Sequence, residues 1–420
     1  METLEILELF GGIGACSMAL EKLGISYNIA DYVEIDKYAV KSFNAIHDTN
    51  FEPQDIRKWD KDIKVDLIMH GSPCQDFSLA GKNAGGDKDS GTRSSLMYET
   101  IRIVEKLKPK YVIWENVKNL LSKKHRHNFD AYLEQMERLG YTNYYQVLNA
   151  KDYGIPQNRE RVFTISILKE SIVYDDYNSN IRKDQDTIGT LTTNCGSSTI
   201  RNGWKIIEHK QHFEFPPKQE LKLKLKDMLE DKVDEKYYLS EKMIKYISAS
   251  GTANFKNKDA KINLDIGRPL TTDPNKRAGT TNYLSDDLPA NYDLSILIKN
   301  NTKKGCLEAF EGDGVDISGR MQYHRGTVQK QMIQTLNTKQ DYGVVTENLR
   351  IRKLTPKECW RLMGFDDEDF EKAQKVNSDT QLFKQAGNSI VVNVLEAILS
   401  NLLLDNENEI VGQISIYDII

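Results

Sequence analysis

The sequence predicts an α/β protein: a doubly wound sheet covered by helices, followed by a smaller, irregular, β-rich domain. Two observations lead to this prediction. Over the first 168 residues, short β-branched runs alternate with helix-length amphipathic segments, which is typical of a mostly parallel sheet with helices on its faces. From about Lys169 the content of Asn, Thr, Lys and Asp rises and the apolar runs shorten, so we place the start of the second domain there.

The individual elements follow from these runs in chain order. Strands are predicted at residues 4–10, 28–35, 65–71, 111–117 and 162–168, and helices at 15–23, 37–46, 96–107 and 128–139. In the second part, helical periodicity is clear only near residues 221–247, where the charged stretch 230–243 is expected to form a solvated helix face. Thr355, Pro356 and Glu358 predict a helix start, because they combine a favoured N-cap, a favoured first residue and an acidic first turn.

Composition restricts the class of protein. The chain has 420 residues, 39% hydrophobic and 28% charged, with a mean hydropathy of −0.56, which indicates a soluble protein of two or three domains. Polar residues interrupt the apolar stretch 390–404, so no membrane span is expected, and the acidic start does not resemble an export signal. Five scattered cysteines without metal-binding spacing predict no metal site and unbridged thiols in a reducing cytoplasm. A net charge of −5 argues against a protein that coats nucleic acid through bulk charge, but leaves a local basic surface open.

A glycine-rich turn follows the first predicted strand. In Leu9-Phe10-Gly11-Gly12-Ile13-Gly14 the glycines let a ligand approach backbone amides at the start of a helix. Glu34, about 20 residues on at the end of the second strand, could hold ribose hydroxyls. An NAD enzyme and an S-adenosylmethionine enzyme both have this pattern, and a tight turn without a ligand remains the third interpretation.

Three further motifs lie where predicted strands reach one edge of the sheet. Pro73-Cys74-Gln75 supplies a thiol that can act as a nucleophile, and Glu115-Asn116-Val117 supplies a carboxyl that can protonate or hydrogen-bond a ring nitrogen. Residues 157–161, QNRER, place two arginines at period two, which suits carbonyl or phosphate oxygens. Taken singly, each has a structural interpretation: a half-buried cysteine, an exposed strand-end acid and a surface ion-pair ladder. The glycine-punctuated loop 81–96 has the composition of a mobile lid.

Together and in this order, the motifs resemble the cytosine-5 DNA methyltransferase family of bacteria and phages. That family carries an FxGxG cofactor loop, a PCQ nucleophile, ENV, a QxRxR pair and a C-terminal GNS. The matching residues are 10–14, Pro73-Cys74-Gln75, Glu115-Asn116-Val117, 157–161 and Gly387-Asn388-Ser389. The resemblance covers residues 1–167 and 350–404, while the middle of the chain matches only in position and in the dipeptide Thr335-Leu336.

The resemblance implies a division of labour. Residues 1–167 and 383–420 would form a Rossmann-like catalytic domain that binds S-adenosylmethionine and releases S-adenosylhomocysteine, and 168–382 a target-recognition domain and hinge. Cys74 would add to carbon 6 of a flipped-out cytosine, and Glu115 would contact ring nitrogen 3. Arg161, with Arg159 nearby, would hold the base carbonyl and the geometry of the catalytic loop.

The remaining residues that the resemblance assigns fall into two groups. Those expected at the cofactor are Phe10, Gly12, Gly14, Glu34, Asp55, Leu96, Asn388 and Ser389. Those expected at DNA are Gln75, Arg320, Arg325, Thr335 and Leu336. Ile35 departs from the family pattern, because relatives often carry an aromatic residue at this position beside the adenine.

The implied partner is double-stranded DNA, bound by a monomer in the cytoplasm without a membrane or an obligate protein partner. Three alternatives stay open. A tRNA cytosine-5 methyltransferase has the same motifs but a shorter variable region than the 180 residues from 169 to 348. A catalytically silent DNA-binding regulator would be expected to lack Cys74 or Glu115, and both are present. An NAD dehydrogenase would leave the PCQ, ENV and double-arginine motifs unexplained.

Overall fold

A six-stranded sheet forms the centre of the first lobe, in the order β2-β1-β3-β4-β7-β5. The computed structural model describes residues 3–73, 96–169, 173–175, 205–207, 213–248, 295–318, 323 and 325–404. The strands of this sheet are β1 (Leu4–Leu9), β2 (Tyr27–Val33), β3 (Leu67–His70), β4 (Tyr111–Val117), β5 (Tyr141–Asn149) and β7 (Glu160–Leu168). Strands β2, β1, β3 and β4 are parallel, whereas β7 runs antiparallel to both β4 and β5.

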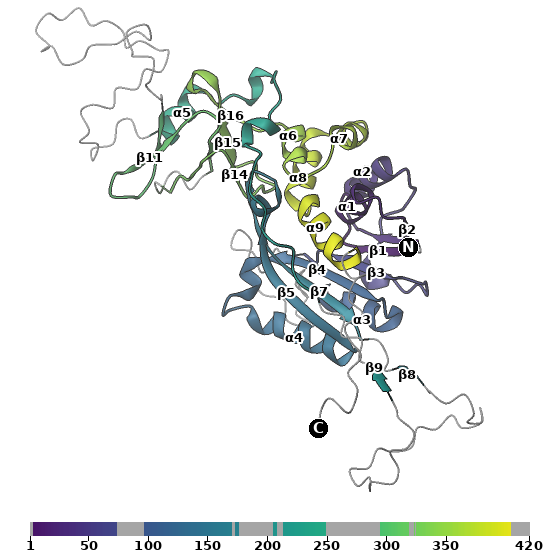
Figure 1. Ribbon diagram of the computed structural model, residues 1–420. Coiled ribbons are helices and arrows are strands. Elements are labelled where there is room, and N and C mark those ends of the chain that lie inside the picture. The colour runs from purple at the N-terminus through teal and green to yellow at the C-terminus, as the bar shows by residue number, and fades with distance from the viewer. Residues whose placement is uncertain are drawn as a thin grey trace, which may run out of the picture.

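Helices cover both faces of this sheet, as the alternating pattern predicts. They are α1 (Ala15–Lys22), α2 (Lys37–His47), α3 (Met97–Leu107) and α4 (Arg126–Arg138). Figure 1 shows α3 and α4 on one face, with α1 and the C-terminal helix α9 (Val392–Leu403) on the other. Adjacent residues of β1 point to different cores: Ile6 packs in the cluster that contains α1 and α9, and Leu7 in the cluster that contains α3 and α4. The five predicted strands and four predicted helices are therefore confirmed, with ends that differ by a few residues.

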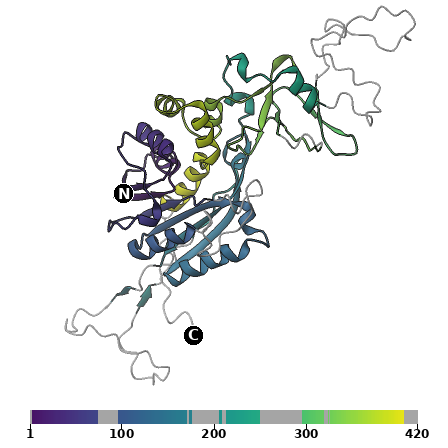
Figure 2. The same cartoon turned by 180° about the vertical axis from the view of Figure 1, so that it is seen from behind.

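The C-terminal helices belong to the same core. They are α6 (Pro356–Arg361), α7 (Asp367–Gln374), α8 (Asp379–Asn388) and α9. Apolar residues of α6 to α9 share one buried cluster with α1, and Figures 1 and 2 show these helices between the N-terminal helices and the second lobe. The predicted start of α6 is confirmed, because the Thr355 hydroxyl accepts from the Glu358 N–H while Glu358 accepts from the Thr355 N–H. We call this sheet and its helices, in residues 3–169 and 354–404, the α/β lobe.

One helical stretch in the described part of the chain is long and apolar enough to cross a membrane by length and composition alone. It covers Asp379–Leu403, which includes α8 and α9, and half of its apolar window is buried within the protein. The side chains of Val394, Leu395, Ile398 and Leu399 are all buried. This stretch therefore packs as a core helix pair, with α9 against the sheet and α1.

The second lobe, between residues 238 and 353, is β-rich (Figures 1 and 2). A hairpin of β10 (Ile296–Lys299) and β11 (Cys306–Ala309) lies beside a four-stranded antiparallel sheet in the order β13-β12-β15-β16. The strands of that sheet are β12 (Gly314–Asp316), β13 (Val328–Gln329), β15 (Tyr342–Val345) and β16 (Ile351–Lys353). With α5 (Glu241–Ile247), they enclose a separate apolar cluster that includes Ile247, Ile298, Val315 and Val345.

A short strand pairing connects the lobes: the two-residue strand β6 (Gln157–Asn158) pairs in parallel with β14 (Ile333–Gln334). A separate antiparallel pair is formed by β8 (Val173–Asp175) and β9 (Lys205–Ile207). Single 3₁₀ turns occur at Ile56–Lys58, Lys118–Leu121, Ala150–Tyr153, Leu225–Met228, Glu235–Tyr237 and Glu347–Leu349.

The helix predicted across residues 221–247 is wrong over most of its length. The structure has two 3₁₀ turns there and α-helix only from Glu241 to Ile247. Backbone groups that a helix would pair internally bond instead to distant segments: the Leu225 N–H donates to Gln331 O, and the Leu239 N–H to Ile351 O. Tertiary pairing therefore replaces the local helix that the charge pattern favoured.

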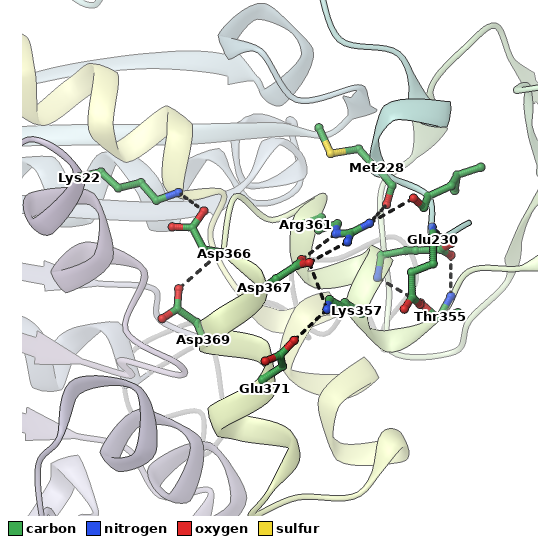
Figure 3. Close-up of polar contacts among 12 residues, drawn as sticks. Lys22, Met228, Glu230, Thr355, Lys357, Arg361, Asp366, Asp367, Asp369 and Glu371 are labelled. Carbon is green, nitrogen blue, oxygen red and sulfur yellow. Dashed lines mark hydrogen bonds and ion pairs between the residues drawn. The ribbon is translucent and has the colours of Figure 1, made fainter. Parts of the chain in front are cut away.

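A polar junction joins the two lobes at α6 and α7 (Figure 3). Arg361 pairs with Asp367 and donates to the carbonyls of Met228 and Leu229, so α6 holds the segment that leads into the β-rich lobe. On the other side, Lys22 of α1 pairs with Asp366 at 3.1 Å, at the start of α7. The C-terminal helices are therefore fixed to both the first helix and the second lobe.

Candidate active site

A largely buried ion pair lies at the carboxyl end of β4. Register places Arg161 of β7 opposite Val117 of β4, so Glu115, two residues before Val117, has its side chain on the same face as Arg161. The Arg161 Nε atom lies 2.9 Å from Glu115 Oε1, and the two side chains are only 16% and 12% exposed. The sequence motifs predict both residues at this edge, but not their direct contact.

The surroundings of Glu115 favour its protonated form more than water does. Burial raises the pKa of the Glu115 carboxyl, while the positive charges of Arg161 and Arg159 partly oppose that rise. A carboxyl with a raised pKa can share a proton with a ring nitrogen near neutral pH. The geometry therefore suits Glu115 to hold a proton on a heteroaromatic base.

The end of β3 lies next to this pair. A Cβ atom on Gly71 would be 3.8 Å from Glu115 Oε2 and 3.5 Å from Ile390 Cδ1, so β3, β4 and the turn after α8 meet at one point. Gly71 is followed by buried Ser72 and by Pro73. The predicted nucleophile Cys74, the predicted DNA contact Gln75 and the predicted lid to residue 95 lie outside the described residues.

Arg159 points to a different set of partners from Arg161. Its guanidinium is buried and donates to three backbone carbonyls, those of Leu336 at 3.1 Å, Gly387 at 3.2 Å and Ser389 at 2.7 Å. These carbonyls belong to the segment after β14 and to the C-terminal end of α8. In this structure Arg159 joins chain segments that are far apart in sequence, and its expected contribution to base binding stays a prediction.

Gln157 completes this junction, although the sequence analysis gave it no role of its own. Its side chain is fully buried; Nε2 donates to Leu362 O at 2.8 Å, and Oε1 accepts from the Leu336 N–H at 3.1 Å. A glutamine that bonds through both ends of its amide fixes the two segments it touches. The QxRxR spacing was a usable signal for the motif, but its residues do not share one strand face, because Gln157 lies in β6, Arg159 between the two strands and Arg161 in β7.

The glycine-rich turn after β1 is held by β2. The Gly12 N–H donates to Glu34 Oε2 at 3.2 Å, and the Tyr32 hydroxyl donates to Gly12 O at 2.6 Å. Phe10, Gly12 and Gly14 all have positive φ, at 53°, 58° and 82°. A Cβ on Gly14 would collide with His47, whereas one on Gly12 would meet no atom within 4 Å. Gly14 is therefore needed for packing on α2, and Gly12 borders open space.

Glu34 presents a carboxylate beside that space. Its Oε1 atom accepts from the Asp36 N–H at 2.8 Å, and burial raises its pKa. Each carboxylate oxygen has two acceptor sites, so Glu34 keeps capacity for ligand hydroxyls. The adjacent Ile35 is 65% exposed, an apolar side chain available to cover a flat ring. These residues fit an adenosyl group.

The other predicted cofactor residues lie around the same edge. The Gln54 N–H bonds to Glu34 O at 2.8 Å, which brings the following Asp55 close, although the Asp55 carboxylate is paired with Arg57 at 2.6 Å. Lys384 of α8 pairs with Asp36 at 2.6 Å and so connects the β2 end with the helix that ends at Asn388. Asn388 is exposed, Ser389 is buried, and Leu96 is half-buried at the start of α3.

Comparison with known proteins identifies the family. Residues 4–403 match the family model described as C-5 cytosine-specific DNA methylase. The chain belongs to this family. The orphan methyltransferase M.SPBetaI of Bacillus phage SPbeta is 34% identical over 96% of this chain and 98% of its own length. The type II methyltransferase M2.ScrFI of Lactococcus lactis subsp. cremoris is 30% identical over 95% and 99%.

Solved structures of other methyltransferases share the fold of this DNA methylase. DNMT2 of Spodoptera frugiperda superposes with a TM-score of 0.52 at 20% identity, covering 95% of this chain and 99% of that one. The Entamoeba histolytica methyltransferase EhMeth gives 0.53 at 16% identity, covering 97% and 100%. The motif-based expectation of a DNA cytosine-5 methyltransferase is confirmed for family and activity. Among the alternatives left open, a dehydrogenase does not match the family found.

The residues of this methylase predicted to contact DNA are placed differently from one another. Thr335 donates its hydroxyl to Asn158 O at 2.8 Å, and the Leu336 side chain is 1% exposed with both backbone groups bonded to Gln157 and Arg159. In this structure the buried Leu336 side chain has almost no surface with which to contact a base, so the predicted DNA contact is not formed by it in this conformation. Arg325 is exposed and forms a β-bridge with Asn300, while Arg320 lies outside the described residues.

Proposed function

We propose that this enzyme methylates carbon 5 of a flipped-out cytosine in a specific duplex DNA sequence, through a covalent adduct between the base and Cys74. The observation that supports it most is the largely buried Glu115–Arg161 pair beside Gly71, which follows β3 and lies two residues before the Pro73-Cys74 peptide. A carboxyl and a guanidinium in contact at a sheet edge offer one donor for a ring nitrogen and one for a carbonyl.

Covalent activation explains why a thiol is needed. Carbon 5 of cytosine is a weak nucleophile, and addition of the Cys74 thiolate to carbon 6 makes carbon 5 electron-rich. Glu115 would hold the proton at nitrogen 3 and so stabilise the adduct, while Arg161 would bind the carbonyl oxygen at carbon 2. After methyl transfer, loss of the carbon 5 proton to a base expels the Cys74 thiolate and restores the aromatic ring.

S-Adenosylmethionine would supply the electrophilic methyl group on its sulfonium. The open space at Gly12, the remaining acceptor capacity of Glu34 and the exposed Ile35 support binding of its adenosyl part at the β1 and β2 ends. Phe10, Gly14, Asp55, Leu96, Asn388 and Ser389 would complete this site. In this arrangement the chain's own residues hold the cofactor on one side of the edge and the base on the other.

The β-rich lobe would read the DNA sequence. A base stacked in a duplex cannot reach the sheet edge, so the target must leave the helix and the vacancy must be filled. Support comes from an apolar cluster of this lobe's own, around Ile247, Ile298 and Val315, whereas Ile333, Tyr342 and Val344 of the same lobe pack in the α/β core. We place recognition within residues 168–382 and catalysis in 1–167 and 383–420. The packing of α6 to α8 on α1 and α9 favours extending the catalytic part back to about residue 354.

We further propose that the substrate is duplex DNA and that the enzyme acts as a monomer in the cytoplasm. Bisulfite sequencing of plasmid DNA from cells that express the protein tests it directly, because it reports both activity and target. Protected cytosines should occur at one recurrent sequence and should disappear with Cys74→Ala. Protection that persists in Cys74→Ala would reject the covalent mechanism, and methylation restricted to RNA would reject duplex DNA as substrate.

A further inference from the structure

Beyond the ion pair, the end of β3 has an anchor made of side chains. The last paired residue of β3 is His70, opposite Trp114 of β4, while β4 itself continues to Val117. At this point the Trp114 Nε1–H donates to the Ser72 hydroxyl at 2.9 Å. Asn116 approaches the same residue, with Nδ2 at 3.4 Å from both the hydroxyl and the carbonyl oxygen of Ser72.

The donor in this contact is held rigidly. Trp114 is 1% exposed, its ring stacks on His70 with an interplanar angle of 3°, and Tyr132 lies against it at 4.1 Å between ring centroids. His70 Nε2 is in turn 3.0 Å from the Tyr132 hydroxyl. A side chain packed on two sides has little rotamer freedom, so the position of the indole N–H is fixed by β4 and α4.

We infer that Ser72 and Trp114 are a positioning pair that holds the exit of β3, and with it the nucleophile, at the correct place relative to Glu115. This inference rests on the proposed role of Cys74. Ser72 is separated from Cys74 only by Pro73, whose ring fixes its φ. A displacement of Ser72 would therefore also displace Cys74. Trp114 directly precedes Glu115 in β4, so one hydrogen bond couples both reacting groups.

The energetic reason is the cost of misplacement. Enzymes gain rate by holding reacting atoms near contact distance, and an error of about 1 Å can lower a rate by roughly 100-fold. Strand pairing of β3 ends at His70. After that residue, the hydrogen bond from the buried Trp114 N–H holds the chain in the way that further strand pairing would have done. Ser72 and Trp114 touch neither base nor cofactor in this role, so both act through Cys74 and Glu115.

The test compares Ser72→Ala, Trp114→Phe and the double variant in single-turnover methyl transfer with saturating DNA and S-adenosylmethionine. Each single change should lower the rate about 10-fold or more, with cofactor affinity unchanged, because both remove the same hydrogen bond. The double variant should be no slower than the slower single variant. Ser72→Thr keeps the hydroxyl and should restore most of the rate.

Ser166→Ala is the matched control, since Ser166 is also buried in this sheet and donates to Asn143 at 2.6 Å, away from the edge. It should lower the melting temperature as Ser72→Ala does and leave the rate unchanged. The inference is overturned if Ser72→Ala and Trp114→Phe keep the wild-type rate, or if their effects multiply in the double variant.

Covalent trapping of the protein on DNA that carries 5-fluorocytosine tests the proposed function independently of this inference. If wild type forms a covalent complex that Cys74→Ala cannot form, the nucleophile is established and only the positioning pair is at issue. Ser72→Ala should then trap DNA more slowly, to the same final extent. Trapping by Cys74→Ala would overturn the proposed function instead.

Discussion

The Glu115 carboxyl has a raised pKa and contacts Arg161, and its protonation determines what it can do for a base. Burial raises its pKa and Arg161 lowers it, so the group stays able to exchange a proton. Glu115→Gln keeps the shape but cannot give up or regain a proton, and we expect kcat to fall by roughly 100-fold. Glu160→Gln, an exposed acid next to Arg161 in β7, is the control and should stay within about threefold. Equal rates for the two variants would remove Glu115 from the chemistry.

Glu8 is a second buried acid and lies beside the glycine-rich turn after β1. Ser17 donates to it through both its N–H and its hydroxyl, and burial raises its pKa to about 7. The native state keeps this proton between about pH 4.5 and pH 7 while the unfolded chain loses it. The contribution of Glu8 to stability is therefore complete below pH 4.5 and lost as the pH rises through 7, a change of about 3 kcal/mol.

Glu8→Gln should remove this pH dependence, because the amide accepts from Ser17 without titrating. We would measure the free energy of unfolding in urea at pH 4.5 and at pH 8. From the lower to the higher pH, the variant should become more stable relative to wild type by up to about 3 kcal/mol. Glu21→Gln, an exposed acid of α1, should follow wild type at both. A constant difference between Glu8→Gln and wild type would show that Glu8 ionises normally in the folded protein.

At the scale of elements, Glu358 is the centre of the contacts between β16, α6 and the segment before the β-rich lobe. It accepts from both Nη atoms of Arg352, at 2.8 and 2.7 Å, and from the N–H groups of Thr355 and Glu230. Arg352 and Glu358 are 2% and 0% exposed, so removal of one partner leaves a buried charge. We expect Glu358→Ala to lower the free energy of unfolding by about 3–5 kcal/mol.

The contrast is with an exposed pair of similar geometry. Arg138 and Glu134 lie 2.6 Å apart on α4, with side chains 64% and 61% exposed. Glu134→Ala should cost less than about 1 kcal/mol in the same urea titration. If both variants lost the same amount, burial at the junction would have no special effect on the Arg352–Glu358 pair.

Elements were predictable where one local signal was strong. The strand that carries Glu115 and the Thr355 cap were found because an apolar run and an N-cap leave clear patterns. Strand β5 was missed, since Thr142, Asn143 and Gln146 break the alternation and its pairing with β7 is long-range. The contacts of Arg159 with carbonyls more than 170 residues away could not be read from spacing at all.

At the scale of the whole molecule, the proposed division of work between the two lobes has to explain how an enzyme with a net charge of −5 binds a polyanion. Affinity for DNA then depends on local cations and on base contacts rather than on total charge. Glu115 and Arg161 lie in the α/β lobe, outside the segment that we propose to read the DNA sequence. Under this proposal, a change of target sequence would require no change at Glu115 or Arg161.

Exchange of residues 169–348 for the matching segment of a relative with a known, different target should therefore move methylation to the donor's sequence. Cofactor affinity should stay the same, because Gly12 and Glu34 are outside the exchanged segment. Base contacts are worth about 1–3 kcal/mol for each bidentate pair, enough to redirect the site when the whole set is replaced. Bisulfite sequencing of plasmid DNA reads the outcome, with Arg325→Gln in the parent as a finer probe. A phosphate contact by Arg325 would weaken binding to all sequences, whereas a base contact would relax one position. A folded, active chimera that kept the parent's target would place sequence reading in the α/β lobe and overturn this division.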